Sequence, residues 1–214
     1  MSKDSATAGG AEGPGGVRGG VPSAECSSAS AEWPLLLILS GPSGAGKTVL
    51  AQRLVAEYAP GLQRAVTYTT RPPRPGEVDG RDYHFVTERA FNDLVDAHAF
   101  VEDALVHGYY YATPWAPLRQ REHDVLLILD WQGEQALSFQ ADDRHRVTVF
   151  IRPADPARLG ARLRGRATDP NIDQRLGDAA EFLGHESVYQ HVIVNEDLEE
   201  AYRQLRSIYQ DAKR

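Results

Sequence analysis

The stretch LLLILSGPSGAGKT, residues 35–48, decides the fold of this chain. It begins with five consecutive apolar residues, Leu35 to Leu39, a pattern typical of a strand buried on both faces of a parallel sheet. The run leads into Gly41–Thr48, GPSGAGKT, which matches the phosphate-loop pattern and is followed by a helical repeat. Because the loop stands between a buried strand and a helix, we interpret it as a binding loop for a nucleoside triphosphate rather than as a chance glycine-rich turn.

The residue types of the loop explain what it would do. Its glycines let successive backbone N–H groups point inward at phosphate oxygens, and the start of the helix adds its positive dipole end. Lys47 is expected to reach the outer phosphates, and the Thr48 hydroxyl is expected to ligate Mg²⁺. The predicted triphosphate-binding residues of the loop are Gly41, Ser43, Gly44, Ala45, Gly46, Lys47, Thr48 and Val49.

Further apolar runs alternate with helical repeats along the chain. Val125–Leu129, Val147–Ile151 and the weaker run Val192–Val194 are predicted to be strands. Asp197, followed by Glu200, resembles a capping box at the start of a C-terminal helix. Apolar residues recur at helical spacing at Leu50, Leu54 and Tyr58, at Leu159 and Leu163, and at Leu198, Ala201, Leu205 and Ile208. This order predicts an α/β fold with a largely parallel sheet and helices on both faces.

The composition excludes several classes of function. A chain of 214 residues with 42% hydrophobic residues holds one ordinary domain, and a formal net charge of -7 argues against a broad nucleic-acid-binding face. Residues 1–32, rich in Gly, Ala and Ser, are expected to be a disordered tail. No run approaches the roughly 20 apolar residues of a membrane span, the single cysteine leaves no disulfide, and the histidines lack metal-ligand spacing. We expect a cytoplasmic protein without nucleic-acid or membrane partners; monomer and homo-oligomer both remain open.

The segment from Thr67 to Trp115 breaks the alternation of strands and helices. It contains a strand candidate, Tyr83–Val86, a helix candidate near Glu88–His98, and three consecutive tyrosines at 109–111. We interpret it as an insertion that folds over the edge of the sheet as a small substrate-binding subdomain.

A proline-braced turn in this insertion carries two arginines. Arg71 and Arg74 offer forked donors well shaped for a phosphate monoester, and Tyr83 could add a hydroxyl. Taken alone, the same pattern is equally compatible with an exposed basic turn.

From about Leu35 to its C-terminus the chain resembles the guanylate kinases. The resemblance rests on six motifs in the family's order: GPSGAGKT (41–48), TTRPPRPGEVDGRDYHFV (69–86), FVEDALVHGYYYATP (100–114), LDWQG (129–133), RLRGRATD (162–169) and VIVNEDLEEA (192–201). It implies a P-loop NTPase-type domain over residues 33–214, with a GMP-binding insertion at 67–117 and a small helical lid at 154–178. It also implies a transferase of purine nucleotide metabolism that uses ATP and Mg²⁺ to phosphorylate GMP and dGMP.

The resemblance further implies roles for residues of the insertion. The GMP phosphate would be held by Arg71, Arg74, Tyr83 and Tyr111, with Glu77 bracing the turn. The guanine base would be read by Thr67, Glu102, Thr113 and Asp130. The chemistry agrees, because guanine presents a ring N–H and an exocyclic amine on one edge, and carboxylates accept from both. Adenine presents an acceptor at that ring position, which would leave a buried carboxylate without a partner.

Arginines of the predicted lid complete the expected catalytic set. Arg162 and Arg166 share one helical face, and Arg175 follows after a short loop. In the family's arrangement, closure of the lid would bring these three to the ATP phosphates and expel water. With Lys47 and Arg71 they would offset the charge of phosphoryl transfer, and no general base is needed because the GMP phosphate is already charged. Asn195 would lie near the adenine of ATP.

The chain also departs from the family's pattern. Ile128 stands where the family usually has an acidic residue two positions before Asp130, a carboxylate that commonly orders water around Mg²⁺. Ala112 stands in place of a usual glycine, Tyr109 in place of an asparagine, and Ala167 in place of a glycine. Two alternatives therefore stay open: a related kinase that acts on a modified nucleotide or a sugar phosphate, and a non-catalytic guanylate kinase-like binding module. Intact phosphate-loop residues argue against the second.

Overall fold

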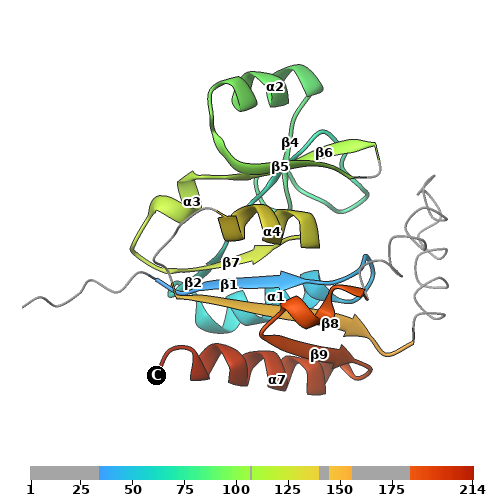
Figure 1. Cartoon of the computed structure of the whole chain (residues 1–214), viewed down its shortest axis with the longest axis vertical. Coiled ribbons are helices and arrows are strands. Elements are labelled where there is room, and N and C mark those ends of the chain that lie inside the picture. Colours follow the sequence, from blue (N-terminus) through green and yellow to red (C-terminus); the bar gives the residue numbers. More distant parts are fainter. Residues whose placement is uncertain (1–33, 107, 140–144, 156–183) are drawn as a thin grey trace, which may run out of the picture. The chain divides into compact units, whose positions relative to one another are not determined.

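The computed structural model describes residues 34–106, 108–139, 145–155 and 184–214 (Figure 1). The predicted tail at 1–32 and the helical repeat at Leu159 and Leu163 lie outside these ranges, as does nearly all of the predicted lid. Among the residues described, no helix combines the length and the apolar character needed to cross a membrane.

A five-stranded, wholly parallel sheet forms the centre of the described part, in the order β2-β7-β1-β8-β9. Its strands are β1 (Leu36–Ser40), β2 (Leu62–Arg64), β7 (Asp124–Ile128), β8 (Arg146–Pro153) and β9 (His191–Asn195). The α/β prediction and its four strands are thus confirmed to within two residues. The short β2 was not predicted, because its sequence LQR offers a single apolar residue.

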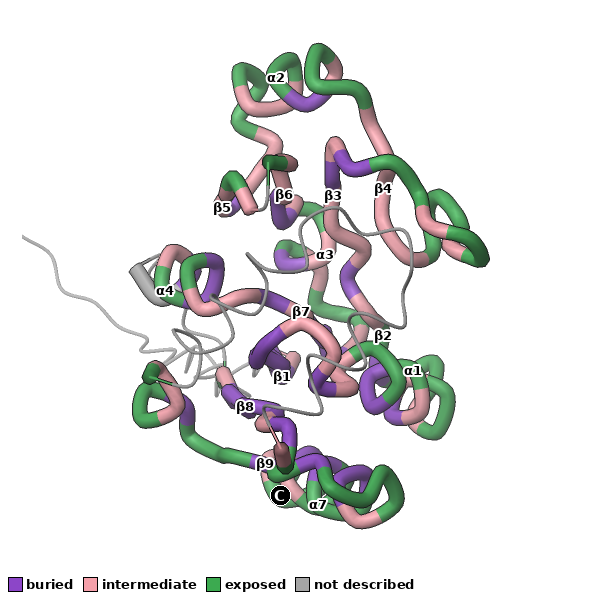
Figure 2. The backbone as a smooth tube through the Cα atoms, turned by 90° about the vertical axis from the view of Figure 1, so that its right-hand side faces the viewer, coloured by how far each residue is buried: buried purple, intermediate pink, exposed green. Residues whose placement is uncertain are grey.

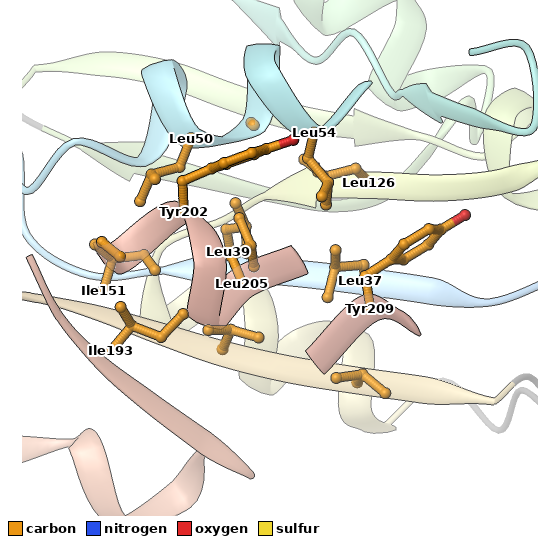
Figure 3. Packing of buried hydrophobic residues seen from close by; sticks show 14 of the residues in the cluster. Leu37, Leu39, Leu50, Leu54, Leu126, Ile151, Ile193, Tyr202, Leu205 and Tyr209 are labelled. Atoms are coloured by element: carbon orange, nitrogen blue, oxygen red, sulfur yellow. The ribbon is translucent and has the colours of Figure 1, made fainter. Parts of the chain in front are cut away.

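Helices cover both faces of this parallel sheet. Successive side chains of a strand point to opposite faces, and in β1 Leu37 and Leu39 belong to one apolar cluster while Leu36 and Ile38 belong to the other. Helices α1 (Lys47–Tyr58) and α7 (Leu198–Asp211) cover the first face. Figure 3 shows this packing, with side chains of α1 and α7 meeting those of the strands. Helices α3 (Ala116–Arg119) and α4 (Trp131–Phe139) supply Leu118 and Leu137 to the second cluster.

The C-terminal helix α7 differs in detail from its predicted pattern. The Asp197 side chain accepts a hydrogen bond from the backbone N–H of Glu200 at 2.8 Å, as a capping box requires. The Glu200 carboxylate, however, accepts from Gln204 Nε2 at 2.9 Å, so we observe one half of the box. Ala201 and Leu205 are buried as predicted, whereas Leu198 is 36% exposed and the buried face extends instead to Tyr202 and Tyr209.

The insertion forms a second sheet of four strands, in the order β4-β3-β6-β5. Its elements are β3 (Tyr68–Thr69), β4 (His84–Phe85), α2 (Glu88–Asp96), β5 (Phe100–Val106) and β6 (Tyr109–Pro114). The strand and helix candidates are both present, and the N-cap residue of α2 is Thr87, whose side chain accepts a hydrogen bond from Ala90 N. Phe91 of α2 packs on Phe100 and Tyr110. Figure 2 shows that buried segments gather in the parallel sheet, while this insertion sheet is mostly half-buried.

Candidate active site

A cavity of about 200 Å³ lies where the carboxyl ends of β1 and β7 meet the insertion sheet. This is the edge at which open α/β sheets bind their ligands. The predicted site residues that line it are Gly41, Ser43, Lys47, Thr67, Arg71, Arg74, Tyr83, Glu102, Tyr111, Thr113 and Asp130. Residues from the phosphate loop and from the insertion therefore share one cavity.

The phosphate loop adopts a backbone that only glycine tolerates easily. Gly41, Gly44 and Gly46 have φ of 133°, 84° and 100°. A Cβ on Gly41 would also lie 2.2 Å from the carbonyl oxygen of Ile151 in β8. Lys47 Nζ donates to the carbonyl oxygens of Gly41 at 2.5 Å and Pro42 at 3.0 Å, which folds the side chain back over the loop.

Asn195 braces the phosphate loop and does not line the cavity. It ends β9, is 7% exposed, and donates through Nδ2 to the carbonyl oxygen of Ala45 at 2.7 Å. A Cβ on Gly46 would lie 2.3 Å from the same Nδ2. Sequence reasoning placed Asn195 near the adenine base; the contact seen here is with the loop backbone.

The arginine turn is organised by Glu77. Arg71 is 6% exposed and donates to Glu77 Oε1 at 2.9 Å, while the backbone N–H of Arg74 donates to Glu77 Oε2 at 2.7 Å. Burial tends to lower the pKa of Arg71, but the hydrogen bonds and charges of Glu77 and Tyr111 together outweigh burial, and the pKa is raised. Burial likewise tends to raise the pKa of Glu77, and the bonds from Arg71 and Arg74 outweigh it, so that pKa is lowered. Both groups of the pair are therefore held in their charged forms.

Aromatic rings of the insertion lie close to the buried guanidinium. The Arg71 guanidinium carbon is 5.4 Å from the ring centroid of Tyr83 and 5.7 Å from that of Phe85. The rings of Tyr83 and Tyr111 meet edge to face with centroids 6.0 Å apart, and both line the cavity. Burial raises the pKa of the Tyr83 phenol, which stays a neutral hydrogen-bonding group beside the arginine.

Two carboxylates, Glu102 and Asp130, line the cavity. Glu102 and Thr113 are partners across the β5–β6 ladder, and the Thr113 hydroxyl donates to Glu102 Oε1 at 2.6 Å. Burial raises the pKa of Glu102 to about 7, and the nearby charges of Asp130 and Asp103 add to the shift. Asp130 Oδ1 accepts from the backbone N–H of Gly133 at 2.8 Å. The cavity thus presents two carboxyl groups, and the protonation of Glu102 is sensitive to near-neutral pH.

The remaining walls of the cavity are apolar. Ala104 and Val106 follow Glu102 on the same face of β5, and Ala112, Ile128 and Leu129 also line the cavity. Sequence reasoning noted Ala112 and Ile128 only as departures from the family pattern. It did not select Ala104 and Val106, although the period-2 spacing of 102, 104 and 106 could have indicated them. Ile128 contributes an alkyl group where the family usually has a carboxylate.

Some predicted site residues lie elsewhere. Arg162, Arg166 and Arg175 fall outside the described residues. Thr48 and Val49 are exposed in the first turn of α1, next to the cavity-lining Lys47. Within the described ranges, no group of three or more His, Cys, Asp or Glu could hold a metal ion.

Comparison with known proteins gives one consistent result. Residues 34–212 match the sequence model of a family described as guanylate kinase. A guanylate kinase of Cereibacter sphaeroides is 43% identical over 179 residues, covering 81% of this chain and 84% of that protein. One from Nitrobacter winogradskyi is 44% identical over 179 residues, covering 81% of each. The crystal structure of guanylate kinase from Anaplasma phagocytophilum matches with a TM-score of 0.70 and 31% identity, covering 84% of this chain and 86% of that one.

Proposed function

The chain belongs to the guanylate kinase family, and from that premise we propose how its cavity performs the family's reaction. It is an enzyme that transfers the terminal phosphoryl group of ATP to GMP, with ADP and GDP as products. One observation carries the assignment of roles: a single cavity is lined by the phosphate loop, by the arginine turn and by the two carboxylates.

On the acceptor side, the arginine turn would hold the GMP phosphate. Arg71 and Arg74 would supply the charge, Tyr83 and Tyr111 the hydroxyls, and Glu77 the rigidity that keeps the turn in place. Fixed, charged donors cost little reorganisation when the phosphate arrives, which favours both binding and alignment.

The carboxylates would read the guanine base together with two threonines. In its ionised form Glu102 accepts hydrogen bonds, and guanine offers two donors on one edge; Asp130 can accept as well. Thr113 is already engaged with Glu102, and Thr67 lines the same cavity. Adenine would place an acceptor against a carboxylate, so the site would select against AMP by the cost of that unpaired group.

On the donor side, the loop would hold the ATP phosphates. A phosphate seated in the loop would compete with the Gly41 and Pro42 carbonyls for the Lys47 ammonium, which now contacts both. The exposed Thr48 hydroxyl at the start of α1 suits Mg²⁺, which commonly takes few protein ligands and several oxygens from phosphates and water. When bound, Mg²⁺ would neutralise charge on the outer phosphates of ATP. The lid arginines 162, 166 and 175 would add positive charge around the transferred group.

The reaction then depends on alignment and charge neutralisation rather than on a base. The attacking oxygen belongs to the GMP phosphate, which is ionised at neutral pH, so Lys47 and Arg71 need only offset charge between donor and acceptor.

We further propose that dGMP is accepted, that the enzyme works in the cytoplasm, and that Ile128 slows turnover without abolishing it.

A coupled ADP-release assay tests the assignment. ATP and Mg²⁺ are supplied with GMP, dGMP, AMP, CMP or UMP. The assay is run on the variant Lys47→Ala and, as a control, on Lys213→Ala, just beyond the C-terminal end of α7. Turnover with GMP and dGMP that is lost in Lys47→Ala and kept in Lys213→Ala is expected. Activity on a modified purine nucleotide or a sugar phosphate but not on GMP would move the proposal to the related-kinase alternative. GMP binding without turnover would move it to the binding module.

A further inference from the structure

The first turn of α4 contains a glycine, Gly133, that the helix itself does not require. Its backbone is helical, outside the left-handed region where glycine is required. Alanine forms helices more readily than glycine at such a position. The local backbone therefore gives no reason for a glycine, and the reason must lie in the space around it.

That space is taken by the two cavity carboxylates. A Cβ built on Gly133 would lie 3.3 Å from Asp130 Oδ1, 3.3 Å from Glu102 Oε2 and 3.4 Å from Glu102 Cδ. The two distances to oxygen atoms are tighter than ordinary van der Waals contact, and the two carboxylates come from different elements, β5 and the junction of β7 with α4. An added methyl group would press on both of them at once.

Neither carboxylate is free to move aside without cost. Glu102 is tied on its other oxygen by the Thr113 hydroxyl at 2.6 Å. Asp130 is tied by the backbone N–H of Gly133 itself at 2.8 Å, the kind of bond that an N-cap residue accepts from the third residue of a helix. Gly133 thus orients Asp130 through its N–H and makes room for both carboxylates by having no side chain.

We propose that Gly133 is a positioning residue of the base-reading site, whose missing side chain and N–H together set the spacing of the Glu102 and Asp130 carboxylates. The inference rests on the proposed role of this pair in reading guanine. It gives the helix α4 a function in specificity: its first turn fixes the carboxylates, and a larger residue there degrades recognition of the acceptor base while leaving the phosphate loop untouched.

The variant Gly133→Ala tests this, with Gly184→Ala as the matched control, because a Cβ on Gly184 would meet nothing within 4 Å. Steady-state kinetics with GMP and ATP are measured for both, with melting temperatures. We expect Gly133→Ala to raise KM for GMP about tenfold and to lower the preference for GMP over AMP, with KM for ATP within twofold of wild type. Gly184→Ala is expected to change neither constant.

A double-mutant cycle with Glu102→Asp separates crowding from a general loss of structure. The shorter aspartate withdraws from Gly133 and leaves only the contact with Asp130, so in that background Gly133→Ala is expected to raise KM for GMP by clearly less than tenfold. An unchanged KM for GMP in Gly133→Ala would overturn the inference. So would a variant that fails to fold and stays unfolded in the Glu102→Asp background. A wild-type enzyme that does not phosphorylate GMP would instead refute the proposed function, which keeps the two failures distinct.

Discussion

The two sheets of this enzyme contribute to the cavity in different ways. In the parallel sheet, β1 is buried along its whole length and offers the ligand only the loop that leaves its carboxyl end. In the insertion sheet, β5 alternates between half-buried and exposed residues, and its half-buried face points Glu102, Ala104 and Val106 into the cavity. Strand β1 therefore contributes through the loop that follows it, whereas β5 contributes through its own side chains.

This contrast predicts that substitutions in the two sheets affect different substrates. Phosphates look alike on every nucleotide, and a loop that binds them through its backbone carries little information about the base. In the proposed function, side chains of the insertion sheet would distinguish one base from another, and they depend on a few fixed hydrogen bonds. Substitutions in the insertion are expected to change KM for GMP, whereas substitutions around the loop are expected to change the use of ATP.

The largest expected effect on the insertion side comes from Glu77→Ala. Arg71 would be left buried without its carboxylate, which costs about 3 kcal/mol in similar buried pairs, and the backbone of Arg74 would lose its partner as well. We expect KM for GMP to rise roughly 100-fold with KM for ATP nearly unchanged, measured in the ADP-release assay. The exposed Glu88, in α2 of the same insertion, supplies the control Glu88→Ala. Equal rises in both KM values would show that the two sheets do not act separately.

The second effect is a pH dependence specific to GMP. With the Glu102 pKa at about 7, the carboxyl is increasingly protonated below pH 7 and can no longer accept two donors from guanine. We expect KM for GMP to rise by up to about tenfold per pH unit below 7. The GMP phosphate also titrates near pH 6, so inhibition by AMP, which carries the same phosphate, is the control. A KM for GMP that follows the AMP curve would contradict this prediction.

The same carboxyl links function to stability. Its pKa is raised in the folded state from 4.5 to about 7, so its contribution to stability is fully present below pH 4.5 and is lost as pH rises through 7. The neutral isostere Glu102→Gln is therefore expected to raise the melting temperature at pH 8, and much less at pH 5, while abolishing selective use of GMP. A lower melting temperature at pH 8 would mean that the ionised carboxylate stabilises the fold.

A smaller effect, on the loop side, is expected from Asn195→Ala. The buried carbonyl of Ala45 would lose its donor, a loss of about 1–3 kcal/mol, and the phosphate loop would be less well fixed. We expect KM for ATP to rise several-fold and KM for GMP to stay within twofold. Asn92→Ala, on the exposed side of α2, is the control. A change in KM for GMP without a change in KM for ATP would contradict the assignment of Asn195 to the phosphate loop.

The sequence predicted the parallel sheet better than the insertion sheet, for a physical reason. Two buried strands can be recognised directly in the sequence, one at the start of residues 35–48 and one in the run Val125–Leu129. Both faces of such strands need apolar side chains, so the strands appear as continuous apolar runs. In β5 and β6 the polar partners Glu102 and Thr113 occupy the face that turns to the cavity, so the apolar alternation that marks a half-buried strand is interrupted there.

The contacts that set the site geometry could not be predicted from local patterns at all. Asn195 meets Ala45 across 150 positions of the chain, and a Cβ on Gly133 would meet Glu102 from another sheet. Such contacts depend on how the elements pack, which periodicity does not reveal. The family resemblance indicated the residues of the site, and the structure shows how Glu77 contacts Arg71 and Arg74 and how Thr113 contacts Glu102.

The smallest effect on activity is expected at the opposite end of the parallel sheet, in Tyr209→Phe. There the buried Asp124 accepts from the Tyr209 hydroxyl at 2.7 Å, from the backbone N–H of Leu35 at 2.9 Å and from Lys213 Nζ at 3.0 Å. Losing one of three donors is expected to lower the free energy of unfolding by about 1 kcal/mol, measured by urea denaturation. The control is Tyr58→Phe, because the Tyr58 hydroxyl accepts from Gln210 at an exposed position, and its loss is expected to lower the free energy of unfolding less.

Because the amino ends of the strands lie away from the cavity, kcat and both KM values should stay within twofold of wild type. A larger change in KM for ATP than for GMP would show that α7 transmits strain through the parallel sheet to the phosphate loop, and the two ends of that sheet could no longer be treated as independent.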